Sequence, residues 1–132
     1  MRALGYVLTI LLVDDDPLQA FVLKSILEKR FSNVQRVSDA AEALCLIEQP
    51  EFAENLGIIV SRHSLAGIGG PAFVAELHTR MPFLPVLVLG DAVGDAANYP
   101  GEHVGFLTRP ILPDKLLALA SQMLALGERK TA

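Results

Sequence analysis

The chain has 132 residues, of which 52% are hydrophobic and 20% charged, and a net charge of -4. This length fits one domain with a substantial buried core and is too short for two ordinary domains. The 11 Lys and Arg residues are scattered, so nucleic-acid binding is not suggested. The uncharged stretch Ala3 to Val13 is shorter than the roughly 18 residues of a membrane-spanning helix.

The single cysteine, Cys45, cannot form an internal disulfide, which agrees with a reducing compartment. It lies in a helical pattern beside Leu44 and Ile47, so we expect a small buried hydrophobic residue there. Together with the absence of a spanning segment, this favours a cytoplasmic protein.

Four short apolar runs show no polar alternation, and a fifth, weaker run fits an edge strand. Continuous apolar runs are typical of strands covered on both faces, as in a parallel sheet between helices. The four runs are Thr9–Val13, Gly57–Val60, Val86–Leu89 and Val104–Leu107, and the weaker run is Asn33–Val37.

Segments with helix-start signals and helical spacing lie between these runs. Asp16 and Pro17 supply an N-cap and a first-turn proline for a helix ending near Arg30, with Gln19 at the position of a capping-box partner. Further helices are predicted to begin near Asp39, Gly70 and Pro113. Residues 91–103 contain Gly94, Pro100 and Gly101, so the fourth helix is predicted to be short or missing.

The alternation of strands and helices implies right-handed crossovers and an α/β fold. We expect a flavodoxin-like, doubly wound parallel sheet of five strands in the order 2-1-3-4-5, with helices on both faces. The domain is placed at residues 9–126. Residues 1–8 are interpreted as an N-terminal extension, and residues 127–132 as a tail or the start of a linker.

Polar residues gather where the predicted strands end, which is where a doubly wound sheet carries its site. Asp14 and Asp15 follow the first strand, Ser61 follows the third, Gly90 ends the fourth and Arg109 follows the fifth. The two adjacent carboxylates repel each other unless a cation offsets them, and carboxylate oxygens suit Mg²⁺.

With these residues in view, the chain resembles the receiver domain of two-component response regulators over about residues 8–126. The resemblance is carried by I-L-L-V-D-D-D-P at 10–17, the loop from Ser61 to Gly69, L-P-V-L-V-L at 84–89 and G-F-L-T-R-P at 105–110. It implies a signalling domain of a phosphorelay, not an enzyme. Its partners would be a histidine kinase, a phosphotransfer protein or an output domain, with a homodimer as another state, and without membrane or nucleic-acid contact by this domain itself.

In this family, a histidine kinase phosphorylates an aspartate at the end of the third strand, beside a bound Mg²⁺. The resemblance assigns that phosphoacceptor position to Ser61 and the acidic pocket to Asp14 and Asp15. It assigns the remaining metal ligand to the backbone carbonyl of His63.

Three further positions follow from the same resemblance. Gly90 stands where the family has a Ser or Thr, and Arg109 where it has a lysine. A cis peptide is expected between Arg109 and Pro110. Phe106 is the aromatic residue that turns inward when the domain switches.

The substitutions at Ser61, Gly90 and Arg109 indicate a degenerate phosphorylation site. Serine has no charge, ligates Mg²⁺ poorly and would give a stable ester in place of a labile acyl phosphate. We therefore expect an interaction module that is independent of phosphorylation. It would require no cofactor, and its metal site would be weak or vacant.

Two structural expectations follow from the same substitutions. Arg109 is expected to bridge Asp14 and Asp15 in the space of metal and phosphate. Phe106 is expected to turn inward because Gly90 leaves room for it. Since the fourth helix is short, partner binding is expected on another face, such as that of the first and fifth helices.

Other functions remain open from the sequence. The domain would still be a phosphorylated receiver if Asp91 or Asp16 accepted the phosphoryl group. Gly67-Ile68-Gly69 with Ala72 matches a lenient dinucleotide-binding motif, although six residues, Ser61 to Ala66, separate it from the strand. Ser61 with His63 as a hydrolase pair is disfavoured, because both lie in one loop without a nucleophile elbow.

Overall fold

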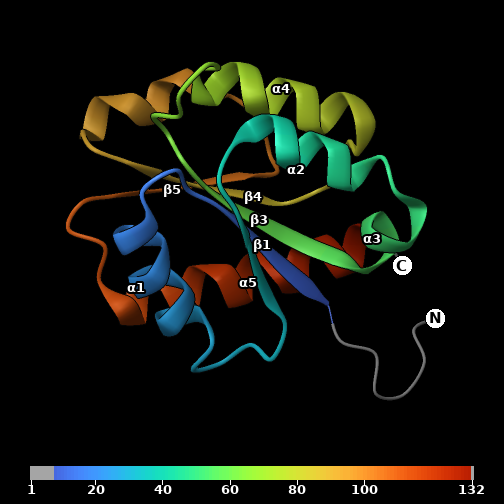
Figure 1. Cartoon of the computed structure of the whole chain (residues 1–132), viewed down its shortest axis with the longest axis horizontal. Helices are drawn as coiled ribbons and strands as arrows, with labels where there is room; N and C mark the ends of the chain where they lie inside the picture. Colours follow the sequence, from blue (N-terminus) through green and yellow to red (C-terminus); the bar gives the residue numbers. More distant parts are fainter. Residues whose placement is uncertain (1–7, 132) are drawn as a thin grey trace.

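The computed structural model describes residues 8–131, with side chains described as far as residue 125. Its sheet has five parallel strands in the order β2-β1-β3-β4-β5, which confirms the predicted flavodoxin-like topology (Figure 1). The weak run predicted as an edge strand is indeed β2 at one edge. The strands are β1 Thr9–Val13, β2 Val34–Val37, β3 Leu56–Arg62, β4 Val86–Gly90 and β5 Val104–Thr108.

Helices cover both faces of the sheet. In Figure 1, α2, α4 and η1 lie above the sheet, whereas α1 and α5 lie below it. The helices are α1 Pro17–Leu27, α2 Ala40–Ile47, α3 Pro50–Asn55, α4 Gly70–Arg80, the 3₁₀ helix η1 Val93–Asn98 and α5 Pro113–Thr131. No helix in the described part of the chain is long and apolar enough to cross a membrane.

Three helical segments can be compared with what the sequence predicted. The fourth helix is reduced to the short 3₁₀ helix η1, as the glycines and proline of residues 91–103 predicted. The short helix α3 was not predicted, because six residues are too few to show a helical period. Helix α5 continues to Thr131, past the boundary expected at residue 126, because one glycine within a run of helix formers costs only about 1 kcal/mol.

Side-chain contacts at the helix starts differ partly from those expected. Asp16 caps α1 by accepting from the N–H groups of Leu18 and Gln19. The Gln19 side chain does not complete a capping box, because its Oε1 accepts from Arg109. Cys45 is exposed, so its predicted burial was wrong: the buried stripe of α2 runs through Ala40, Ala43 and Ile47.

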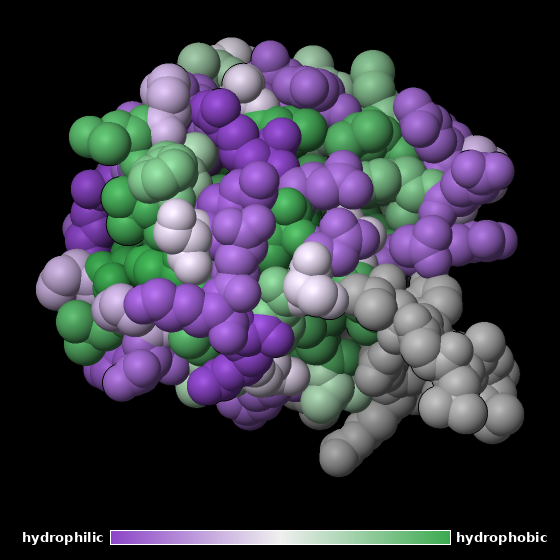
Figure 2. Space-filling model, turned by 60° about the horizontal axis from the view of Figure 1, so that its bottom comes forward, coloured by the Kyte–Doolittle hydropathy of each residue, from purple (hydrophilic) through white to green (hydrophobic). Residues whose placement is uncertain are grey.

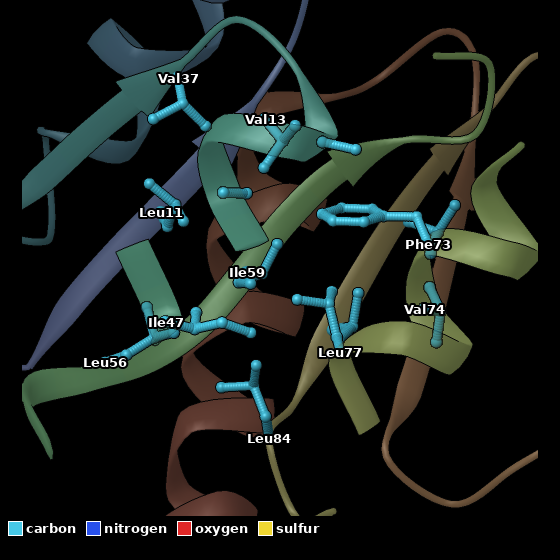
Figure 3. Packing of buried hydrophobic residues seen from close by; sticks show 14 of the residues in the cluster. Leu11, Val13, Val37, Ile47, Leu56, Ile59, Phe73, Val74, Leu77 and Leu84 are labelled. Atoms are coloured by element: carbon cyan, nitrogen blue, oxygen red, sulfur yellow. The ribbon is translucent and has the colours of Figure 1, made fainter. Parts of the chain in front are cut away.

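Two apolar clusters hold the helices to the sheet. The first lies between the sheet and helices α2 and α4, where Phe73 and Leu77 pack against Leu11 and Ile59 (Figure 3). The second lies on the opposite face, where Leu116 and other α5 residues meet the sheet. Because both faces are covered, the inner strands β1 and β4 are buried along their whole length, whereas the edge strand β2 carries Gln35 and Arg36.

All five strands point the same way, so their carboxyl ends form one edge of the molecule, at the left of Figure 1. This edge carries the residues singled out as site candidates.

We expect Leu77→Ala to lower the free energy of unfolding by about 2 to 5 kcal/mol, because this fully buried side chain would leave a cavity. Leu18→Ala is the matched control, since Leu18 is 74% exposed and its truncation should change stability by less than about 0.5 kcal/mol. Urea unfolding measures both values. Equal losses for the two variants would contradict the packing described.

Candidate functional site

The strand register brings the predicted site residues to one edge. Val13 pairs with Ser61, and Ser61 pairs with Val88 on the other side. Gly90 lies opposite Thr108, one residue before Arg109. The acidic pair that follows Val13 therefore lies beside the end of β3, with the ends of β4 and β5 next along the edge.

Asp14 is the buried member of the acidic pair, with 0% of its surface exposed. Its Oδ1 accepts a hydrogen bond from the Asp16 N–H at 2.9 Å, whereas its Oδ2 is buried without a hydrogen-bond partner among the described residues. Burial raises the pKa of the Asp14 carboxyl above its usual value, although the Asp16 N–H and the nearby Arg62 act in the opposite direction. This carboxylate is therefore costly to keep ionised.

Arg62 supplies the positive charge beside this pair. Its Nη1 lies 3.1 Å from Asp15 Oδ1, with which it forms a hydrogen bond, and 3.8 Å from Asp14 Oδ1. The Arg62 side chain is only 20% exposed. Sequence reasoning missed this residue, although its place directly after Ser61 at the end of a central strand could have indicated it.

Arg109 does not bridge the acidic pair, so that expectation was wrong. Its Nε lies 2.8 Å from Asp91 Oδ1, and its Nη2 donates to Gln19 Oε1 at 2.8 Å. The Arg109 guanidinium thus has Asp91 and Gln19 as its partners. The positive charge beside Asp14 and Asp15 comes from Arg62 instead. The Arg109–Pro110 peptide is cis, as predicted.

Ser61 is 1% exposed, and its hydroxyl donates to the Arg62 carbonyl at 3.0 Å. The His63 imidazole does not act on this hydroxyl, because its Nδ1 lies 2.5 Å from the Tyr99 hydroxyl and its Nε2 lies 3.7 Å from Asp95. His63 is therefore not paired with Ser61, which argues against the hydrolase pair.

Burial raises the pKa of Tyr99 to about 12, with a smaller effect from the charge of Asp95. The Tyr99 hydroxyl is hydrogen-bonded to Nδ1 of His63, whose Nε2 lies on the side of Asp95. Tyr99 and His63 therefore link η1 to the loop after β3.

Phe106 lies inward and packs against the first apolar cluster. Its ring centroid is 5.8 Å from that of Tyr99 and 6.5 Å from that of His63. The ring fills the space beside Gly90: a Cβ added there would overlap the end of the ring and lie 3.0 Å from its Cε1. The absence of a side chain at Gly90 is thus what admits Phe106.

The predicted metal ligands do not fit Mg²⁺ in this arrangement. Arg62 lies against both carboxylates, and the His63 carbonyl accepts from the Gly70 N–H at 3.1 Å. Residues 8–131 hold no group of three His, Cys, Asp or Glu side chains placed to bind a metal ion.

The loop from β3 to α4 uses its glycines for different purposes. Gly67 has a φ of 88°, in the left-handed region that favours glycine. Gly69, which the resemblance marks as the turn glycine, has a φ of -68° as the N-cap of α4. The Gly70 N–H is bonded to the His63 carbonyl, so the start of this helix is used to close the loop rather than to hold a phosphate.

Comparison with known proteins agrees with the fold. The family model described as "Response regulator receiver domain" matches residues 10–121, and the chain belongs to this family. Receiver domains are generally signalling modules of two-component systems, and they interact with histidine kinases and output domains. No curated protein matches the sequence.

Solved structures share the fold at low identity. A response regulator receiver protein from Sinorhizobium medicae is 20% identical, with a TM-score of 0.82 over 95% of this chain and 99% of that one. A receiver domain protein from Clostridium thermocellum is 18% identical, with a TM-score of 0.84 over 92% and 98%. The receiver domain of a signal transduction histidine kinase from Syntrophus aciditrophicus is 24% identical, with a TM-score of 0.76 over 89% of each chain.

We expect Asp14→Asn to raise the Tm at neutral pH by roughly 2 to 5 °C, because the site favours a neutral side chain. The folded-state pKa of Asp14 lies above the reference value of 3.8, so ionisation costs stability as the pH rises through the window above 3.8. Below that window the carboxyl is protonated in both states and this cost is absent. The gain should therefore shrink as the pH falls towards 3.8.

Thermal unfolding followed by circular dichroism at neutral and acidic pH measures this gain. Asp15→Asn is the matched control, because the Asp15 side chain is 35% exposed and makes the closer contact with Arg62. It should not stabilise the protein. A lower Tm for Asp14→Asn at neutral pH would refute the interpretation.

Proposed function

We propose that this receiver domain signals without phosphorylation at the end of β3, by binding a protein partner in a conformation that its own side chains set. The observation that carries the proposal is the Phe106 ring seated beside Gly90. In the family, this inward position of the aromatic residue accompanies phosphorylation. In this chain the space is free for the ring because position 90 has no side chain.

The chemistry at Ser61 supports the same proposal. Phosphotransfer in receivers requires a carboxylate that attacks phosphorus and forms a labile acyl phosphate. The Ser61 hydroxyl is buried and donates to the backbone carbonyl of Arg62 rather than to the His63 side chain. A serine ester formed there would be too stable for a reversible switch. On this proposal, the end of β3 lacks the carboxylate that the reaction requires.

The surface around α1 offers a place for a partner. Leu18, Phe21 and Val22 are 74%, 71% and 49% exposed, and Leu18 and Val22 line a groove together with Pro110 and Ile111. Figure 2 shows hydrophobic side chains gathered at its left, where α1 and the loop before α5 lie. Exposed large apolar side chains in one patch are typical of protein contact sites. We infer that the partner binds this α1 surface, because the short η1 leaves little of a fourth-helix surface.

We expect Gly90→Ala to destabilise the protein by about 1 to 3 kcal/mol, because the new methyl group overlaps the Phe106 ring. In the background of Phe106→Ala most of that cost should disappear, so a double-mutant cycle isolates the contact. Gly94→Ala is the matched control, since a Cβ there meets nothing within 4 Å. An undiminished cost of Gly90→Ala in the Phe106→Ala background would place the ring elsewhere.

We expect no labelling when the chain is incubated with Mg²⁺ and a labelled small phosphodonor, because Ser61 cannot form an acyl phosphate. The positive control is Ser61→Asp combined with Arg62→Met, which restores a carboxylate and removes the guanidinium that lies across the acidic pair. Mass spectrometry of peptides locates any label. Phosphorylation of the parent chain at Asp91, at Asp16 or at Ser61 itself would contradict the proposal.

A further inference from the structure

We infer that Arg62 acts as a built-in cation that takes the place of a divalent metal ion at Asp14 and Asp15. Removing its charge would accordingly uncover a divalent-cation site in a chain that otherwise does not bind Mg²⁺. The inference concerns metal binding alone, so it can fail while the proposed function holds, and the reverse.

The contacts around the pair supply the geometry. The Arg62 guanidinium lies 3.1 Å from one carboxylate and 3.8 Å from the other, so a single group faces both. Asp14 Oδ2 is a fully buried carboxylate oxygen with no hydrogen-bond partner among the described residues. This oxygen is available to coordinate a cation, because a buried charge is stable only when it is paired or coordinated.

Other charges near the pair do not replace Arg62. The Arg36 guanidinium donates through Nε and Nη2 to the backbone carbonyl of Asp14, at 3.1 and 2.8 Å, and not to its carboxylate. The Asp16 carboxylate caps α1. Without the Arg62 charge, two carboxylates would share the site with no cation paired to them.

The properties of the two cations explain why the guanidinium prevails. Mg²⁺ loses its water reluctantly and demands near-octahedral oxygen ligands, whereas a guanidinium is weakly hydrated and its planar donors match carboxylates. Arg62 is held beside the acids by β3 and loses no translational freedom when it pairs with them. Ser61 provides no third carboxylate that would favour the dication.

The uncovered site would still have the ligands that Mg²⁺ accepts. Asp14 and Asp15 provide two carboxylates, and water completes the shell in most magnesium sites. The His63 carbonyl accepts one hydrogen bond from the Gly70 N–H, and its second lone pair remains available. Once the guanidinium is removed, both carboxylates would thus be open to the ion.

The test compares the parent chain with Arg62→Met, which keeps the length of the side chain but removes its charge and donors. Thermal unfolding is recorded with increasing MgCl₂ or MnCl₂, and calorimetry measures binding at fixed temperature. Arg62→Lys keeps a positive charge at the same place. Arg109→Met is the matched control, because Arg109 pairs with Asp91 and Gln19 rather than with the acidic pair.

We expect the Tm of Arg62→Met to rise by about 3 °C or more at millimolar Mg²⁺, with a calorimetric signal for one site. The parent chain, Arg62→Lys and Arg109→Met should show neither effect. Adding Asp14→Asn to Arg62→Met should abolish the response.

Two results would overturn the inference. Tight Mg²⁺ binding by the parent chain would mean that Arg62 does not exclude the ion, and this measurement needs no variant to fold. Absence of binding by a folded Arg62→Met would mean that the acidic pair cannot hold the ion even without the guanidinium.

Discussion

The Asp14 carboxylate has no exposed surface and lies next to a second carboxylate at the end of β1, so the pair depends on a positive charge nearby. Parallel strands bring the end of β3 to this point, and the residue after Ser61 is an arginine. The guanidinium of this arginine offsets the negative charge of the two carboxylates, so the positive charge comes from a side chain and not from a dissociable ion. On the inference drawn above, the acidic pair keeps its place at the end of β1 while its cation belongs to the chain itself.

The same edge explains how the domain can hold one conformation. Arg62 on β3 pairs with the acidic residues, and the Phe106 ring on β5 fills the space beside Gly90. Tyr99 and His63 join the two regions, because their side chains bond to each other and their rings pack beside Phe106. We propose that a partner recognising this conformation needs no covalent signal at Ser61.

Much of this arrangement could be predicted from the sequence, and the misses have physical causes. The uninterrupted apolar strands and the Asp16 cap fixed the topology and the edge at which the candidates meet. The partner of each arginine could not be predicted, because a long side chain selects among acids that only the folded register brings close. Arg109, after β5, forms an ion pair with Asp91, after β4, whereas Arg62 forms one with Asp15 of the acidic pair. Tyr99 lies beyond η1 and gave no local signal of its burial.

The position of the Phe106 ring in solution tests the central claim most directly. Nuclear Overhauser effects between the ring protons of Phe106 and the α protons of Gly90 report this contact by NMR. We predict strong effects in the chain as purified, unchanged after Mg²⁺ and a small phosphodonor are added. Effects that are absent at first and arise only after these additions would show that the domain still switches by phosphorylation.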